Sequence, residues 1–151
     1  MKDLLKRFLQ HLRHRNVSRH TLTAYENDVA TFLRFTSQLR QKPLDGLTPA
    51  DVDAFAIRGF LGELHKQRIS ASSSARKLSA IRTFVRFLKR EDLVDGDPAA
   101  LVAAPKKPET IRAHLTIEEL SRLPEMPGSS TTLGRRARAL LELFYASGLR
   151  L

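Results

Sequence analysis

A run of positive charge between residues 66 and 90 is the part of this sequence best suited to binding chemistry. It holds eight basic residues and no acidic one, and a serine-rich stretch at residues 70–74 lies within it. Guanidinium, ammonium and hydroxyl groups donate hydrogen bonds to phosphate oxygens and to base edges. The candidate DNA-binding residues that we select from this run are Ser70, Ser72, Ser73, Arg76, Lys77 and Arg82.

A second cluster with the same chemistry follows Ser18 and consists of Arg19, His20, Thr21 and Thr23. Both clusters stand where a helix is expected to begin, and a helix start presents free amide groups that favour anions. The two helix starts are therefore predicted to grip one duplex together. Two simpler interpretations stay open, namely that the charge run is only a solvated helix face and that Ser18 is only an N-cap.

Other chemistries have little support in the spacing of the residues. His11 and His14 lie one helical turn apart, but without supporting carboxylates or cysteines they do not predict a metal site. Tyr25 lies on the buried face of its expected helix and Tyr145 near the end of an apolar helix, so both are interpreted as structural residues and not as exposed nucleophiles. We find no glycine-rich phosphate loop, catalytic carboxylate pair or Ser/His/Asp arrangement.

The overall composition favours the same class of partner. The 151 residues carry a formal net charge of +10, which favours polyanions, with nucleic acid ahead of an anionic membrane. No apolar run approaches the roughly 18 residues of a membrane span, so no membrane partner is expected. The N-terminus has no apolar signal segment, and the chain has no cysteine. These features predict a cytoplasmic protein.

Four helices are predicted to position the two clusters, because apolar residues recur at three- and four-residue spacing. The first helix spans Leu4 to Leu12, and the second runs from Ser18 to about Gln41. A third follows the proline-containing start at Thr48 and Pro49. The fourth follows Ser70. The expected buried positions of the last three are Leu22, Tyr25, Val29, Phe32, Leu33 and Leu39; Val52, Phe55, Ile57, Phe60, Leu61 and Leu64; and Leu78, Ile81, Phe84, Val85, Phe87 and Leu88.

The remaining residues are expected to form a linker and two further helices. Residues 103–108 are proline-bounded and basic, as interdomain linkers often are. A capping box at Thr116 and Glu119 predicts a short helix, and Gly148 is well placed to end a longer one. The predicted class is all-α, with one domain at residues 1–102, a linker at 103–114 and the start of a second domain at 115–151.

Four segments in this order resemble the Xer-type tyrosine recombinases of the phage integrase family. Residues 18–29 are similar to the family's second helix, and residues 72–84 to its DNA-contacting helix. Residues 97–108 resemble its linker, and residues 138–150 the opening helix of its catalytic domain. The resemblance implies a four-helix SAM-like core-binding domain, followed by a linker and the first helices of a truncated catalytic domain. Ala137 departs from the pattern, since the family usually has aspartate there.

The family's chemistry implies a tyrosine that attacks the scissile phosphodiester and arginines that stabilise the phosphoryl charge. Arg150 matches the first catalytic arginine, and Lys106 and Lys107 fall in the linker, where they are expected to contact DNA. No metal or nucleotide cofactor is implied. The remaining active-site groups are expected beyond Leu151, so this chain is expected to bind DNA without cleaving it.

The resemblance also implies partners. These are double-stranded DNA and a second related recombinase, in a tetramer that resolves chromosome dimers at a dif-like site. A mobile-element integrase is the first alternative. A non-catalytic helical DNA-binding regulator and a basic RNA-binding protein are the others.

Overall fold

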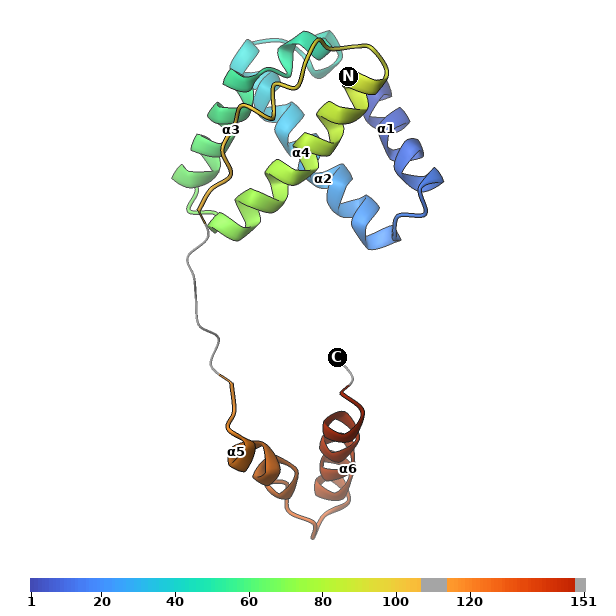
Figure 1. Cartoon of the computed structure of the whole chain (residues 1–151), viewed down its shortest axis with the longest axis vertical. Coiled ribbons are helices and arrows are strands. Elements are labelled where there is room, and N and C mark those ends of the chain that lie inside the picture. Colours follow the sequence, from blue (N-terminus) through green and yellow to red (C-terminus); the bar gives the residue numbers. More distant parts are fainter. Residues whose placement is uncertain (107–113, 149–151) are drawn as a thin grey trace. The chain divides into compact units, whose positions relative to one another are not determined.

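The computed structural model describes residues 1–106 and 114–148, and every regular element within these ranges is a helix (Figure 1). The all-α prediction is confirmed. The chain divides into two compact units, Met1–Pro108 and Glu109–Leu151, and each is described by itself. No helix of the described residues is both long and apolar enough to cross a bilayer.

The first unit contains four α-helices. They are α1 (Lys2–His14), α2 (Arg19–Arg40), α3 (Ala54–Lys66) and α4 (Ala71–Arg90), and two short 3-10 turns, η1 (Leu44–Gly46) and η2 (Pro49–Asp51), join α2 to α3. The helix α2 packs against each of the other three. This arrangement makes α2 the centre of the unit.

The core forms because each helix contributes one fully buried phenylalanine. Phe8, Phe32, Phe60 and Phe84 come from α1, α2, α3 and α4 in turn, and none is more than 2% exposed. Phe8 meets Phe84 edge to face, with ring centroids 5.3 Å apart, and Phe32 meets Phe60 in the same way at 5.5 Å. Edge-to-face contact is a favoured geometry for aromatic pairs, so these contacts help to fix how the helices cross.

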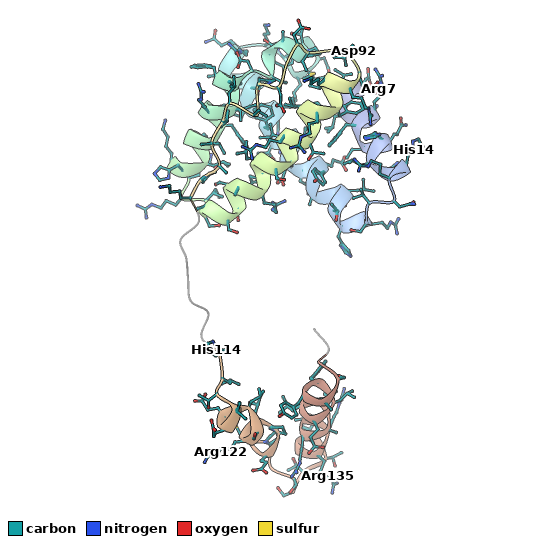
Figure 2. The ribbon with its side chains drawn as sticks, in the orientation of Figure 1. Arg7, His14, Asp92, His114, Arg122 and Arg135 are labelled. Atoms are coloured by element: carbon teal, nitrogen blue, oxygen red, sulfur yellow. The ribbon has the colours of Figure 1, made fainter. Side chains whose placement is uncertain are left out.

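The ends of the four helices follow two local patterns. Ser18 caps α2 through its side-chain oxygen, as predicted, and Ser70 caps α4 in the same way. Each helix is followed by a residue other than glycine in the left-handed conformation, where φ lies between 53° and 57°. These four residues are Asn16, Gln41, Arg68 and Asp92. Figure 2 shows Asp92 near Arg7 of α1. The residue before Asp92, Glu91, forms an ion pair with Arg7.

The predicted start of α3 is wrong. The side chains of Thr48 and Asp51 do form a capping box, but it closes the 3-10 turn η2, and Asp53 caps α3 five residues after Thr48. Two predicted core positions are also wrong, since Phe55 is 63% exposed and Leu39 is 38% exposed. Phe55 lies in the first turn of α3 and its ring faces the guanidinium of Arg40. The spacing of apolar residues predicts that Phe55 belongs to an apolar helix, but it does not show that Phe55 lies on the solvent-facing side of that helix.

The segment after α4 completes the core of the first unit. Ala99 and Val102 are buried, although they follow the last helix of the unit. Arg82 donates to the backbone oxygens of Ala99 and Val102, and Arg58 of α3 donates to that of Leu101. Two helices therefore hold this segment through its carbonyl groups.

The second unit contains α5 (Ile117–Arg122), the 3-10 turn η3 (Leu123–Glu125) and α6 (Thr132–Ser147). The predicted capping box of Thr116 and Glu119 is present, and Gly148 ends α6 with a φ of 62°. No residue of α6 is buried. Tyr145, which we predicted to be a structural residue near the end of an apolar helix, is 56% exposed within this unit.

Candidate nucleic-acid interface

The starts of α2 and α4 are built in the same way. The oxygen of Ser18 accepts a hydrogen bond of 3.2 Å from the Thr21 amide, and that of Ser70 accepts one of 3.2 Å from the Ser73 amide. In both helices the cap hydroxyl also bonds the hydroxyl of the residue three positions on, at 2.8 Å and 3.0 Å. Neither first turn contains an acidic residue. Both helix starts therefore keep their positive end unneutralised.

The capping boxes elsewhere in the chain differ in this respect. At η2 and at α5 the third residue after the cap is a carboxylate, Asp51 or Glu119, and it accepts from the cap amide. A carboxylate at that position offsets the positive end of the helix dipole. At α2 and α4 the third residue after the cap carries a hydroxyl group in place of a carboxylate. The positive end of each helix dipole therefore remains available to an external anion.

A buried carboxylate joins the two helices at the tenth residue of α2. Asp28 of α2 is only 2% exposed and accepts hydrogen bonds from both terminal nitrogens of Arg76 and from Lys77 Nζ, the latter at 2.9 Å. The side chain of Lys77 is 19% exposed, whereas that of Arg76 is 55% exposed. Lys77 therefore pairs with Asp28 in a mostly buried position, whereas Arg76 pairs with Asp28 and also extends into solvent.

Arg76 lies at the border of two hollows. The first, of about 360 Å³, lies between α2 and α4 and is lined by His20, Thr21, Ala24, Tyr25, Asp28, Arg76, Ser79 and Ala80. The second, of about 390 Å³, lies along α4 and is lined by Ser72, Ser73, Ala75, Arg76 and Ser79. The structure thus brings five of the predicted residues together: His20, Thr21, Ser72, Ser73 and Arg76.

Other predicted residues lie elsewhere. Arg19 and Thr23 face the other side of α2, where they line a hollow with Arg13 of α1. Arg82 is engaged with the carbonyl oxygens of the segment after α4. Lys106 is exposed. Lys107 and Arg150 lie outside the described residues.

Within the described residues no group of three or more His, Asp or Glu side chains could hold a metal ion. His11 stacks on Phe87, and its Nε2 lies 2.9 Å from Arg90 Nη1. Because arginine can only donate, Nε2 is the acceptor and the ring is neutral. Burial lowers the pKa of His11, and the positive charges of Arg90 and Arg15 lower it further.

Asp28 is a residue of this site that the sequence analysis does not predict. The signal for it was present, because Asp28 lies three residues after Tyr25 and four before Phe32, on the apolar stripe of its helix. An acidic residue on such a stripe is seldom buried without a charged partner. The positive run on α4 held that partner.

The arrangement can therefore bind an extended polyanion. Two helix starts, a half-exposed guanidinium and several hydroxyl groups line adjoining hollows, and the guanidinium is held by a fixed acceptor. These groups donate hydrogen bonds to phosphate and to base edges. Nothing in the described part of the site resembles a nucleophile beside a general base.

Comparison with known proteins gives one consistent group. Residues 5–92 match the phage integrase N-terminal SAM-like domain. Tyrosine recombinase XerC of Pelobacter propionicus is 40% identical over 151 residues, covering 99% of this chain and 49% of that protein. XerC of Xanthomonas axonopodis pv. citri is also 40% identical, with coverage of 95% and 49%, and XerC of Anoxybacillus flavithermus is 37% identical, with coverage of 97% and 47%.

Among solved structures, a crystal structure of XerA recombinase is 26% identical, with a TM-score of 0.47, covering 90% of this chain and 44% of that one. The chain spans about half the length of the curated relatives it matches.

Proposed function

The chain belongs to the phage integrase family through its N-terminal SAM-like domain, and we propose that it is the DNA-binding part of a Xer-like tyrosine recombinase. The activity of the whole protein would be site-specific DNA recombination. Its relatives named tyrosine recombinase XerC, at 37–40% identity over almost the whole chain, support this proposal.

The observation that carries the proposal is the pair of acid-free helix starts beside the half-exposed Arg76. A helix that enters a major groove presents its N-terminal residues to base edges. On α4 these residues are Ser72, Ser73 and Arg76, and the start of α2 supplies His20 and Thr21 on the other side of the hollow. In this arrangement α4 reads the groove and both helix starts bind phosphates.

Electrostatic attraction provides most of the affinity in such a complex. Each phosphate neutralised by a protein cation releases condensed counterions, so binding weakens as salt rises. The net charge of +10 and the acid-free segment from 66 to 90 favour this mode. Arg19 and Thr23 belong to the proposal as phosphate contacts outside the hollow. Lys106 and Lys107 are proposed as further phosphate contacts.

For catalysis we propose that Arg150 stabilises charge on the phosphoryl oxygens in the complete active site, a task suited to a bidentate guanidinium. The residues 1–151 bind DNA without forming a covalent link to it. Of the active-site groups that the family resemblance implies, only Arg150 has a match in this sequence.

The proposed setting is the cytoplasm, and the partners are a second related recombinase and a tetramer on two duplexes at a dif-like site. A mobile-element integrase is the second candidate for the whole protein. It shares the same DNA-binding unit, and the similarity to relatives named XerC favours the first candidate.

The test measures binding of the chain to a dif-like duplex and to a scrambled duplex of equal length, across a salt series. We expect a preference for the first duplex, a steep salt dependence and no covalent adduct in denaturing gels. Weak binding without preference contradicts the proposal, and an adduct contradicts the claim that the chain does not cleave. Preferential competition by double-stranded RNA would favour an RNA-binding protein, because the A-form major groove does not admit a helix.

A matched pair of variants locates the interface. Arg76→Ala is expected to weaken duplex binding, since it removes the guanidinium between the two hollows. Arg34→Ala removes the same charge from an exposed position of α2, next to α3 and away from the two hollows. It is expected to have little effect on duplex binding. Equal losses in both variants would contradict the assignment of the surface.

A further inference from the structure

Asp28 makes three hydrogen bonds to two cations on the neighbouring helix, and one of those cations lies in the proposed interface. We propose that Asp28 is a positioning residue that sets sequence specificity by holding the Arg76 guanidinium in one orientation. This inference rests on the proposed DNA-binding function and deepens it.

The geometry leaves Arg76 with free donors on its outer side. A guanidinium carries five N–H groups, and Asp28 accepts one from each of the two terminal nitrogens, with the Nη2 to Oδ1 distance at 3.1 Å. The Nε hydrogen and one hydrogen on each terminal nitrogen remain. Nε and a terminal nitrogen together form a second fork, which matches the paired acceptors on the major-groove edge of guanine.

Burial explains why the orientation is fixed. The carboxylate is 2% exposed and α2 holds it in place, so it accepts from Arg76 at a fixed point. An arginine side chain at a surface otherwise samples many rotamers, and ordering it on binding carries an entropic cost. Because Asp28 already orders the Arg76 side chain in the free folded protein, DNA binding does not have to order it.

The charge of Asp28 works in the same direction. Arg76 and Lys77 carry two positive charges and Asp28 carries one negative charge, so the three residues together contribute a net charge of +1. Asp28 thus lowers the attraction of this site for any phosphate, while it keeps the direction of the Arg76 donors. Weaker attraction to all sequences and a fixed hydrogen-bonding direction both raise the discrimination between sequences.

This account separates two roles that a basic residue can have on DNA. A lysine or arginine that binds phosphate adds to affinity for every sequence and steepens the salt dependence. A guanidinium that binds a base edge adds discrimination instead. Asp28 shifts Arg76 from the first role to the second.

The test uses the full chain and a duplex selected from a random-sequence pool by the wild-type protein, with a scrambled duplex of equal composition as reference. We expect Asp28→Asn to lower the ratio of the two affinities by about five- to a hundredfold. Binding to the scrambled duplex is expected to stay equal or rise. The slope of log affinity against log salt is expected to steepen by up to about 0.9, the value for one additional phosphate contact.

A control isolates the position of the charge. Asp51→Asn also removes one negative charge from a buried carboxylate that pairs with a lysine, but Asp51 lies in η2 and lines neither hollow. We expect it to leave the affinity ratio unchanged. Equal losses of discrimination in both variants would overturn the proposal, because a general effect of charge or stability would then explain them.

A second variant keeps the proposal testable if Asp28→Asn fails to fold. Arg76→Lys retains the positive charge and a partner for Asp28, but it lacks the second fork. We expect it to lose discrimination while its salt slope stays that of the wild type. A wild-type chain without any preference would contradict the proposed function itself. Preference that survives in Asp28→Asn would contradict only the role of Asp28, and preference that survives in Arg76→Lys would also contradict base reading by Arg76.

Discussion

The guanidinium of Arg82 donates a hydrogen bond of 2.7 Å to the backbone carbonyl oxygen of Val102. A second, longer bond of 3.4 Å reaches the carbonyl of Ala99. Both acceptors belong to buried residues that follow the last helix of the first unit. Arg82 of the basic helix therefore holds the segment after α4 against the first unit.

We predict that Arg82→Ala lowers the free energy of unfolding by about 1 to 3 kcal/mol, because partly buried carbonyl oxygens lose a charged donor. Urea unfolding of the full chain, followed by circular dichroism, measures this. Arg86→Ala is the control, since Arg86 is exposed on the same helix and makes no hydrogen bond or ion pair with the described residues. A stability loss no larger than that of the control would show that the two carbonyl contacts contribute little.

The packing of α4 leads to a second prediction. Ile81 is fully buried in the core that all four helices share. Ile81→Ala is expected to lower the unfolding free energy by about 2 to 5 kcal/mol, since it removes apolar contact and leaves a cavity. Ser79→Ala, on the exposed side of the same helix, serves as the comparison in the same unfolding experiment. If the two variants were equally stable, Ile81 would not be a core residue.

The carboxylate in η2 predicts a dependence on acid pH. Burial by itself raises the pKa of Asp51, but hydrogen bonds from the Thr48 amide, from Lys42 and from the Thr48 hydroxyl lower it from 3.8 to about 2. A lowered pKa in the folded state means that the stabilisation is complete above the unfolded value and is lost as pH falls through the folded value.

Asp51→Asn is therefore expected to be less stable than the wild type near neutral pH. The difference between the two proteins should shrink as pH falls from about 5 to about 2, where the wild-type carboxylate itself becomes protonated. Urea midpoints measured over this range provide the check. A difference that does not change with pH would mean that the pKa of Asp51 is not lowered.

The helix ends offer a stabilising substitution. Arg68 follows α3 with a φ of 57°, a conformation that is strained for residues with a Cβ atom. Arg68→Gly relieves this strain and is expected to raise the unfolding free energy by about 0.5 to 1 kcal/mol. Arg68→Ala removes the side chain beyond Cβ but keeps Cβ itself, so it should give no such gain in stability. Thermal unfolding distinguishes the two variants, and equal stabilities would exclude backbone strain as the cause.

Much of the first unit could be predicted from the sequence because its signals are local. A serine that caps a helix acts on an amide three residues away, and on that basis the sequence predicts the cap at Ser18. The three- and four-residue spacing on α4 likewise predicted a face whose members Leu78, Ile81 and Val85 are all fully buried. Spacing within one helix determines which residues share a face.

The contacts between helices could not be predicted in this way. Asp28 and Arg76 are 48 positions apart, and their pairing depends on how α2 crosses α4. The same limit explains why Arg19 and Thr23 were grouped with His20 and Thr21. All four lie within five residues of sequence, but the helix turns two of them toward α1 and the other two toward α4.

The prediction of where α3 starts is wrong for a different reason. A capping box with proline after it signals a helical turn and does not specify how many turns follow. At Thr48 the turn ends after three residues, and Asp53 begins the longer helix.

The arginine contacts to the segment after α4 also determine where the first unit can be cut. The family match ends at residue 92, but Ala99 and Val102 lie in the same core, and their backbone oxygens bind Arg82. A shortened chain that ended at residue 92 would leave holes where those side chains pack and a guanidinium without its acceptors. The piece that folds is thus longer at its C-terminal end than the piece that sequence comparison recognises, by the ten residues 93–102. Domain exchange between members of this family should therefore place the junction after Val102, so that the whole core is transferred.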